Sequence, residues 1–118
     1  SLQNNVLDQL NQEGFTPSNL SQLSSKIGDS TEKLMRVLKV AEQQGKLLRI
    51  DGNLMFTQTN FLKLREKVTQ HFSNHTEMSV SEFKELAHTS RKYAVPLLEY
   101  FDKLKITYRD GNTRKMVK

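Results

Sequence analysis

Two groups of cations in the second half of the chain have the side chains that proteins use to bind phosphate. The first is Arg91 and Lys92, in the stretch TSRKYAVPLL at residues 89–98. The second group surrounds a Gly111-Asn112 turn and comprises Arg109, Arg114 and Lys115. Guanidinium and ammonium groups donate charge-assisted hydrogen bonds to phosphate oxygens. Whether the two groups act on one ligand depends on the elements that carry them.

The first group lies at the end of a helix where cations are not expected. The Thr-Ser pair before it is typical of a helix start, and the apolar residues after it have helical spacing. Cations in the first turn face the positive end of the helix dipole, at a cost of about 0.3–1 kcal/mol each. Exposed amides at that end already attract phosphate. These features predict an anion-binding site that includes Ser90, Arg91 and Lys92.

Pro96 in the same helix leaves two interpretations open. If the helix begins near Thr89, Pro96 removes the hydrogen bond to the Lys92 carbonyl and bends the helix, which would aim the cations at a ligand. If regular helix begins only near Val95, Pro96 lies in the first turn, where proline is tolerated. The bent helix is the interpretation we favour from the sequence.

The positive charge of the chain lies in its second half. The net charge is +5, and residues 1–58 contain six cations and six anions, which cancel. Residues 59–118 contain 12 cations and 7 anions and hold the whole excess. A positive region on an otherwise neutral chain suggests a polyanionic partner, although a solvated basic surface that aids solubility is the alternative.

The composition and motifs argue against several classes of protein. The absence of cysteine excludes disulfides and thiolate metal sites and fits a reducing, cytoplasmic compartment. No apolar run approaches the roughly 20 residues that span a bilayer, so we expect no membrane contact. His71 and His75 have helical spacing but no acidic partner for a metal, and Gly45-Lys46 lacks the remaining residues of a phosphate loop. We therefore expect a binding module without catalytic residues, metal or cofactor, and a piece of a longer protein because residue 1 is Ser.

The chain contains one structural plan twice. The segments KLLRIDGNLMF at 46–56 and KITYRDGNTRKMV at 105–117 each contain an Asp-Gly-Asn turn, the second at a sequence offset of 59 from the first. Such turns between strand-forming residues predict β-hairpins. An amphipathic helix precedes each hairpin at the same offset. A shorter helix, which we expect to be capped by Ser18 or Ser81, precedes that one at an offset of 63, which predicts four extra residues around 24–29 in the first copy.

The order of elements predicts the fold. Helices at 3–13 and 60–74 begin the two halves, and short strand-like links at 14–17 and 78–80 follow them. Two further helices and a hairpin complete each half. This order is that of the winged helix, so we predict a mainly α protein with small β-hairpins (α+β), built from two tandem winged-helix domains at 1–58 and 59–118.

The two third helices differ in charge at the same place. The first copy begins Asp29-Ser30-Thr31-Glu32, an acidic start that agrees with the helix dipole, and Arg91 takes the place of Glu32 in the second copy. A local rule that is broken in only one of two copies marks a candidate functional site. The hairpin, or wing, of the second copy is also the basic one. We expect the wing and the start of the third helix to form one polyanion-binding face.

The segment SRKYAVPLLEYFDKLKITYRDGNTR at 90–114 resembles the end of the bacterial selenocysteine-specific elongation factor family, SelB. That family ends in four tandem winged-helix domains, and the whole chain is similar to the last two. The resemblance implies that the second module binds the selenocysteine insertion (SECIS) hairpin of a messenger RNA, next to an in-frame UGA codon. It also implies that the first module is a spacer.

The resemblance further implies which residues bind the RNA. The binding residues would be Ser90, Arg91, Lys92, Arg109, Arg114 and Lys115, with Gly111 and Asn112 shaping the tip of the wing. Tyr108 departs from the family pattern, in which a second basic residue is expected. GTP, magnesium, the ribosome and selenocysteinyl-tRNA would be bound by domains outside this monomeric module.

Two other functions remain open from the sequence: a DNA-binding winged-helix regulator and a protein-docking module. The major groove of A-form RNA is too deep and narrow for a helix, so an RNA-binding winged helix must use its helix start and wing. Residues 94–98 of the third helix are apolar or proline, which is poorly suited to reading DNA bases. Tyr93, Tyr100 and Phe101 have the chemistry to stack on bases, but their helical spacing favours core positions for Tyr100 and Phe101.

Overall fold

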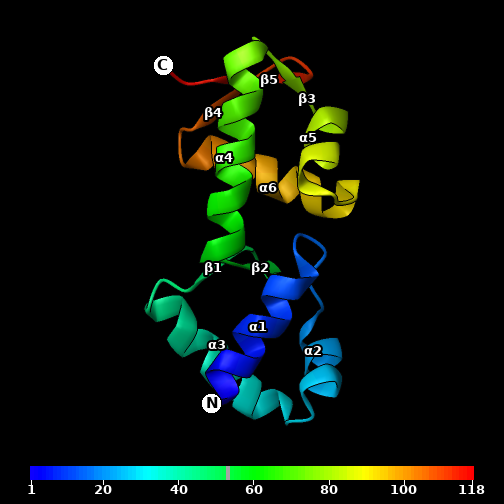
Figure 1. The fold of residues 1–118 in the computed structure, drawn as a ribbon, viewed down its shortest axis with the longest axis vertical. Helices are drawn as coiled ribbons and strands as arrows, with labels where there is room; N and C mark the ends of the chain where they lie inside the picture. The colour runs from blue at the N-terminus through cyan, green and yellow to red at the C-terminus, as the bar shows by residue number, and fades with distance from the viewer. Residues whose placement is uncertain (53) are drawn as a thin grey trace. The chain divides into compact units, whose positions relative to one another are not determined.

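The computed structural model describes residues 1–52 and 54–118, which form two compact units, Ser1–Phe61 and Leu62–Lys118 (Figure 1). The first unit contains α1 (Leu2–Glu13), α2 (Leu20–Ile27), α3 (Thr31–Gln43), β1 (Leu47–Asp51) and β2 (Leu54–Thr57). The boundary between the units lies within α4 (Gln58–Asn74). The second unit continues with β3 (Met78–Ser79), α5 (Val80–Ala87), α6 (Arg91–Lys103), β4 (Thr107–Asp110) and β5 (Thr113–Met116). The predicted fold class, mainly α with small β-hairpins in a winged-helix order, is confirmed.

Each unit has an apolar core between its helices and its hairpin. The core of the first unit consists of Val6, Leu10, Leu23, Leu34, Ala41, Leu47 and Met55. The fully buried side chains of the second unit include Leu64, Val68, Met78, Phe83, Leu97, Leu98 and Phe101. Full burial of one such side chain contributes about 1.5–3 kcal/mol. None of the helices in the described part of the chain has the length and apolarity needed to cross a bilayer.

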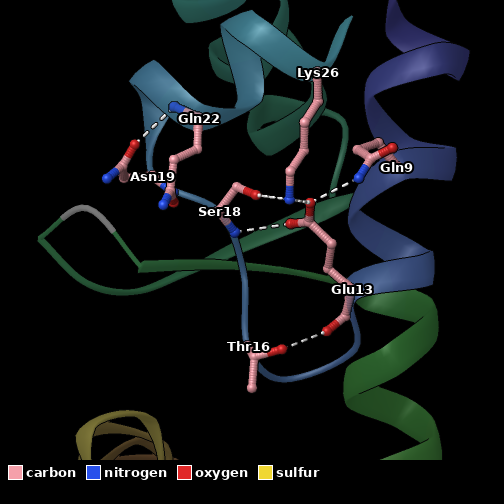
Figure 2. Close-up of polar contacts among 7 residues, drawn as sticks. All are labelled: Gln9, Glu13, Thr16, Ser18, Asn19, Gln22 and Lys26. Carbon is pink, nitrogen blue, oxygen red and sulfur yellow. Dashed lines mark hydrogen bonds and ion pairs between the residues drawn. The ribbon is translucent and has the colours of Figure 1, made fainter.

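The side chain of Glu13 connects α1, α2 and the link between them in the first unit (Figure 2). Its carboxylate accepts hydrogen bonds from the backbone N–H and hydroxyl of Ser18 at 2.8 and 2.7 Å, and from Gln9 at 2.7 Å. Lys26 forms an ion pair with it at 3.0 Å. The side chain of Glu13 is only 9% exposed, so these bonds lie largely out of water. Glu13 therefore fixes the turn into α2.

We expect Glu13→Gln to weaken the first unit in a pH-dependent way. Burial alone would raise the pKa of Glu13, but the hydrogen bonds from Gln9, Ser18 and Lys26 outweigh burial and lower it below 4.5. The resulting stabilisation is complete above pH 4.5 and is lost as the pH falls through the lowered pKa. At pH 7 the substitution should lower the free energy of unfolding by about 1–2 kcal/mol. Urea denaturation, followed by the amide signals of α2, measures this difference.

Asp8→Asn is the matched control for this prediction. Asp8 is exposed on the same helix and makes no ion pair with any residue that the structure describes, so its substitution should change stability by less than about 0.5 kcal/mol. A Glu13→Gln effect that stays constant from pH 7 to pH 3 would contradict the proposed role of the carboxylate.

The links after α1 and α4 differ, and one prediction about them is wrong. Met78–Ser79 forms the strand β3, which pairs with β5 and gives a three-stranded sheet in the order β3-β5-β4. Residues 14–17 form no strand, and the described residues of the first unit form a sheet of β1 and β2 only. Pro17 has no N–H for a sheet hydrogen bond, and the Glu13 side chain binds the next residue instead.

The helix caps correct the predicted register of the repeat. The second helices are capped by Asn19 and Ser79, not by Ser18 and Ser81, and both caps form capping boxes. The C-caps of these second helices are Gly28 and His88. The N-caps of the third helices are Ser30 and Ser90. All these pairs share a sequence offset of 60, and α2 and α5 are equal in length. The first copy therefore has no four-residue insertion.

Only the turns and the returning strands β2 and β5 keep the offset of 59, because β1 contains a bulge before its turn. The pairing of β1 with β2 shifts register between Arg49 and Asp51, whereas β4 pairs with β5 without a shift. An extra residue in one strand is what defines a bulge, and it accounts for the change of offset. The predicted turn of the first hairpin includes Asn53, which lies outside the described residues.

The corrected register also changes which residues of the two amphipathic third helices correspond. Leu34 and Ala41 of α3 correspond to Ala94 and Phe101 of α6, and all four are buried. Phe101 is fully buried against Phe83, with ring centroids 5.9 Å apart, which confirms its predicted core position.

Several other apolar residues of α6 lie nearer the surface, although Leu97 is fully buried. Tyr93, Pro96 and Tyr100 are only partly buried, and Leu104 is 44% exposed. Tyr100 is therefore not the core residue that its spacing predicted.

Candidate nucleic-acid interface

Helix α6 begins at the predicted anion site. Ser90 is its N-cap, and Arg91 is its first residue. The backbone N–H groups of Tyr93 and Ala94 donate to the Ser90 carbonyl at 3.1 and 2.9 Å. Regular helix therefore starts well before Val95, which rules out one interpretation of Pro96. Pro96 lies inside α6, where it provides no N–H for the Lys92 carbonyl.

The Ser90 hydroxyl does not cap its own helix. Ser30 and Ser79, at the starts of α3 and α5, accept hydrogen bonds from the backbone N–H groups of Lys33 and Glu82 at 3.2 and 3.1 Å. Ser90 has the same extended backbone but makes no side-chain cap bond, and its side chain is exposed. The start of α6 thus keeps hydrogen-bonding capacity that the other helix starts use internally.

This difference predicts unequal effects for one substitution at two caps. Ser79→Ala removes a capping bond and should lower the free energy of unfolding by about 1 kcal/mol. Ser90→Ala removes no such bond and should lower it by less than about 0.3 kcal/mol. Thermal unfolding followed by circular dichroism compares the two variants directly. Equal losses would mean that Ser90 caps α6 in solution.

The cations at the start of α6 are unpaired and exposed. Arg91 and Lys92 form no ion pair with any residue that the structure describes. The Lys92 ammonium lies 5.3 Å from the centroid of the Tyr93 ring. In the corrected register their counterparts are Thr31 and Glu32, so the change from an acidic to a basic helix start remains. Two free positive charges beside exposed amides favour an anion such as phosphate.

The two strands of the wing place its predicted binding residues on opposite faces. Side chains alternate along a strand, and residues that are paired across strands share a face. Arg109 is paired with Arg114, on the face that carries the buried Thr107. Tyr108 is paired with Lys115 on the other face, and Tyr108 is 47% exposed. The wing therefore does not present all its cations to one ligand.

Arg114 is not a surface residue, contrary to the sequence prediction. It is 6% exposed, and its guanidinium forms an ion pair with Asp102 of α6 at 3.0 Å. Its Nε also donates to the same carboxylate at 3.2 Å. The alternation of β5 turns Arg114 toward the helices, next to Met78 of β3. We therefore exclude Arg114 from the binding surface.

Lys115 is on the surface but is held by carboxylates. Its ammonium lies 2.8 Å from a carboxylate oxygen of Asp110 and 3.9 Å from one of Glu77. The hydrogen bond to Asp110 and the charge of that carboxylate raise the pKa of Lys115 above its ordinary value. These carboxylates neutralise the charge of Lys115 locally, which weakens its attraction for a phosphate.

Arg109 is the exposed cation of the wing on the face toward the helices. Its Nε donates to the Gly111 carbonyl at 3.0 Å, within the turn that also contains the exposed Asn112. Gly111 has a φ of 63°, a left-handed conformation in which glycine avoids the strain of a side chain. The turn thus fixes the Arg109 side chain without neutralising its charge.

The wing and the start of α6 are near opposite ends of α5. Thr113, just after the wing turn, is paired with Ser79, which is also the N-cap of α5. Helix α6, whose first residue is Arg91, follows the other end of α5. Residues 88–90 connect the two helices, which Figure 1 shows next to each other. A helix of the length of α5 extends about 12 Å. The two groups of cations are therefore two contact points, separated by about the length of one short helix. They do not form one compact anion-binding site.

Comparison with known proteins finds a family model that is similar to most of the second unit. Residues 70–116 match the family described as "Elongation factor SelB, winged helix". A selenocysteine-specific elongation factor of Desulfomicrobium baculatum is 27% identical over 107 residues, which are 91% of this chain and 17% of that relative. The chain thus spans about a sixth of the curated SelB relative that it matches.

Two solved SelB structures share the fold of the chain. One is the mRNA-binding domain of SelB from E. coli in complex with SECIS RNA, with a TM-score of 0.79, 20% identity, and coverage of 100% of this chain and 98% of that one. The other is a bacterial selenocysteine-specific elongation factor, with a TM-score of 0.67, 22% identity, and coverage of 96% and 18%. At these identities the likeness concerns the fold.

Sequence reasoning missed Asp102, the residue that contacts both strands of the wing of the second unit. The Asp102 carboxylate accepts from the Thr107 hydroxyl of β4 at 2.7 Å as well as from Arg114 of β5. The signal was available, because Glu42 holds the corresponding position at an offset of 60 and also binds a hairpin arginine, Arg49, at 3.2 Å. An offset of 59 hides this correspondence.

Proposed function

We propose that the chain binds the SECIS hairpin of a messenger RNA through its second unit, as part of a factor that recodes UGA to selenocysteine. The observation that carries the proposal is the uncapped, basic start of α6, in a unit whose residues 70–116 match the SelB winged-helix family model. The likeness to an mRNA-binding domain solved with SECIS RNA supports the same partner. The proposed binding residues are Ser90, Arg91, Lys92 and Arg109, with Gly111 and Asn112 shaping the wing turn.

The mechanism relies on contacts outside the RNA grooves. The Ser90 hydroxyl and the amides at the start of α6 bind one phosphate, and the charges of Arg91 and Lys92 strengthen that contact. Arg109 binds a second phosphate about 12 Å away, at the wing. A folded hairpin holds its phosphates in a fixed arrangement, so two contacts at a fixed separation favour it over a flexible strand.

Insertion of α6 into a DNA major groove is less compatible with its outer face. Glu99 and Lys103 are exposed there, together with the partly buried Val95 and Pro96. A carboxylate in the middle of the helix would approach the DNA phosphates and lower affinity. The face also has few groups for reading base edges.

The remaining roles in the proposed function belong to the rest of a longer protein. The first unit acts as a spacer, and domains outside this chain bind GTP with magnesium, the ribosome and selenocysteinyl-tRNA in the cytoplasm. The residues present do not fit a GTP site, because Gly45-Lys46 is the turn between α3 and β1 and lacks the other residues of a phosphate loop. The chain itself acts as a monomeric binding module without a cofactor.

A competition assay tests the proposal. A labelled SECIS stem-loop should be displaced by unlabelled stem-loop and much less by a DNA duplex of equal length. If the start of α6 and Arg109 each neutralise one phosphate, affinity should fall about 7–12-fold between 50 and 200 mM salt. Better competition by the DNA would favour a transcriptional regulator. Absence of RNA binding at low salt would overturn the proposal and favour a protein-docking module.

A further inference from the structure

The two units use the same position of the third helix to bind different arginines. Glu42 and Asp102 occupy corresponding positions of α3 and α6, at the same offset of 60 as the helix caps. Glu42 binds Arg49 of β1, with an Nε–Oε2 distance of 3.2 Å. Asp102 binds Arg114 of β5, with a distance of 3.0 Å between the guanidinium and Oδ2.

Arg109 is the counterpart of Arg49, but no carboxylate binds it among the described residues. The two arginines share the same offset, and each donates to the carbonyl of the turn glycine, at 2.6 Å for Arg49 and 3.0 Å for Arg109. They differ in the residue paired across the hairpin. Arg49 is paired with Met55, whereas Arg109 is paired with Arg114.

We propose that Arg114 is a positioning residue that occupies Asp102 and so leaves the charge of Arg109 free for an RNA phosphate. This inference rests on the proposed function. It explains why the wing of the second unit can bind RNA, whereas the similar wing of the first unit cannot. Asp102 accepts from Arg114 and from the Thr107 hydroxyl, so it is bonded to both strands of the wing. In the first unit the equivalent carboxylate neutralises the wing arginine itself.

The lengths and burial of the side chains explain this exchange of partners. Asp102 is one methylene shorter than Glu42, and it binds an arginine whose side chain is 7% exposed. Glu42 binds an arginine whose side chain is 44% exposed, at the outer part of the hairpin. Met55 is buried in the first unit and has no charge for Glu42 to bind. A buried arginine at position 114 thus determines which cation the helix carboxylate binds.

The inference predicts that the arrangement of the first unit can be copied into the second. Asp102→Glu/Arg114→Met supplies the longer carboxylate and the methionine found at positions 42 and 55. The new carboxylate should bind Arg109, lower the affinity for SECIS RNA roughly tenfold, and reduce the slope of log affinity against log salt by about 0.7–0.9. Asp102→Ala/Arg114→Met removes both charges without a new carboxylate, so its salt slope should equal that of the unmodified chain.

Arg109→Met completes the test as a double-mutant cycle. It should lower affinity about tenfold in the unmodified chain and have little further effect in Asp102→Glu/Arg114→Met. The NMR signal of the Arg109 Nε–H reports the new ion pair without RNA, and circular dichroism reports folding.

The possible outcomes separate this inference from the proposed function. Loss of the salt slope in Asp102→Ala/Arg114→Met would mean that Arg114 itself contacts phosphate, and would overturn the inference. An unchanged slope and an unchanged Arg109 signal in Asp102→Glu/Arg114→Met would also overturn it, while RNA binding by the unmodified chain would leave the proposed function intact. Failure of the unmodified chain to bind SECIS RNA would remove both.

Discussion

Arg91→Glu should lower the affinity for a SECIS hairpin at least 100-fold while leaving the second unit as stable as before, or slightly more stable. The substitution reverses a charge at the phosphate contact, and the loss of one charge-assisted hydrogen bond alone costs about 1.5–3 kcal/mol of binding. The same change places a carboxylate in the first turn of α6, where it gains about 0.3–1 kcal/mol from the helix dipole. A substitution that lowers RNA affinity but raises the free energy of unfolding indicates that the cation serves binding and not folding.

Arg36→Glu is the matched control for that experiment. Arg36 is an exposed arginine on α3, the third helix of the first unit, so its reversal changes net charge by the same amount. We expect an effect on RNA affinity below about threefold, since Arg36 belongs to the unit that we propose as a spacer and makes none of the proposed phosphate contacts. Filter binding and thermal unfolding on both variants give the comparison. Similar losses in the two variants would indicate a general charge effect and would place the binding surface elsewhere.

Arg114→Met alone should destabilise the second unit by about 2–4 kcal/mol. It leaves the Asp102 carboxylate three-quarters buried without its arginine. The expected loss is below that for a fully buried pair, because Asp102 keeps some contact with water. Urea denaturation followed by the amide signals of α6 measures the loss in this unit.

Asp102→Ala/Arg114→Met should recover much of that stability. Removal of both charges leaves no uncompensated ion, and replacement of a buried pair by apolar groups is often nearly neutral. The difference between the single and the double variant is therefore the test of the ion pair. A double variant as unstable as Arg114→Met would show that the loss comes from packing rather than from the carboxylate.

The sequence was sufficient for the fold class because its strongest signals are local. Asp110-Gly111 predicts a hairpin turn without reference to the rest of the chain, and the helices before it have clear apolar periodicity. The register between the two copies of the repeat was harder to predict from the sequence. Aligning Ser18 with Ser81 matched residue types, whereas the capping boxes depend on a residue three positions later, Gln22 or Glu82.

The candidate site was predictable at the helix and only partly at the wing. Arg91 stands out because a cation in a first turn breaks a rule that depends on sequence position alone. Which face of a strand Arg114 occupies depends on its pairing with β3 and on the core beneath it, and both are long-range contacts. Composition cannot distinguish a buried basic residue from an exposed one on a short strand of mixed character.

The central position of β5 has a consequence for the selection of RNA partners. In the second unit β5 has a neighbour on each side, whereas the first unit has only two strands among its described residues. A wing that is anchored to a third strand, β3, is preorganised, so it loses little conformational entropy when RNA arrives and cannot adjust to a poorly matching backbone. Discrimination between hairpins should then depend on the geometry of their phosphates, and a stem with the right sequence but an altered bulge should be rejected.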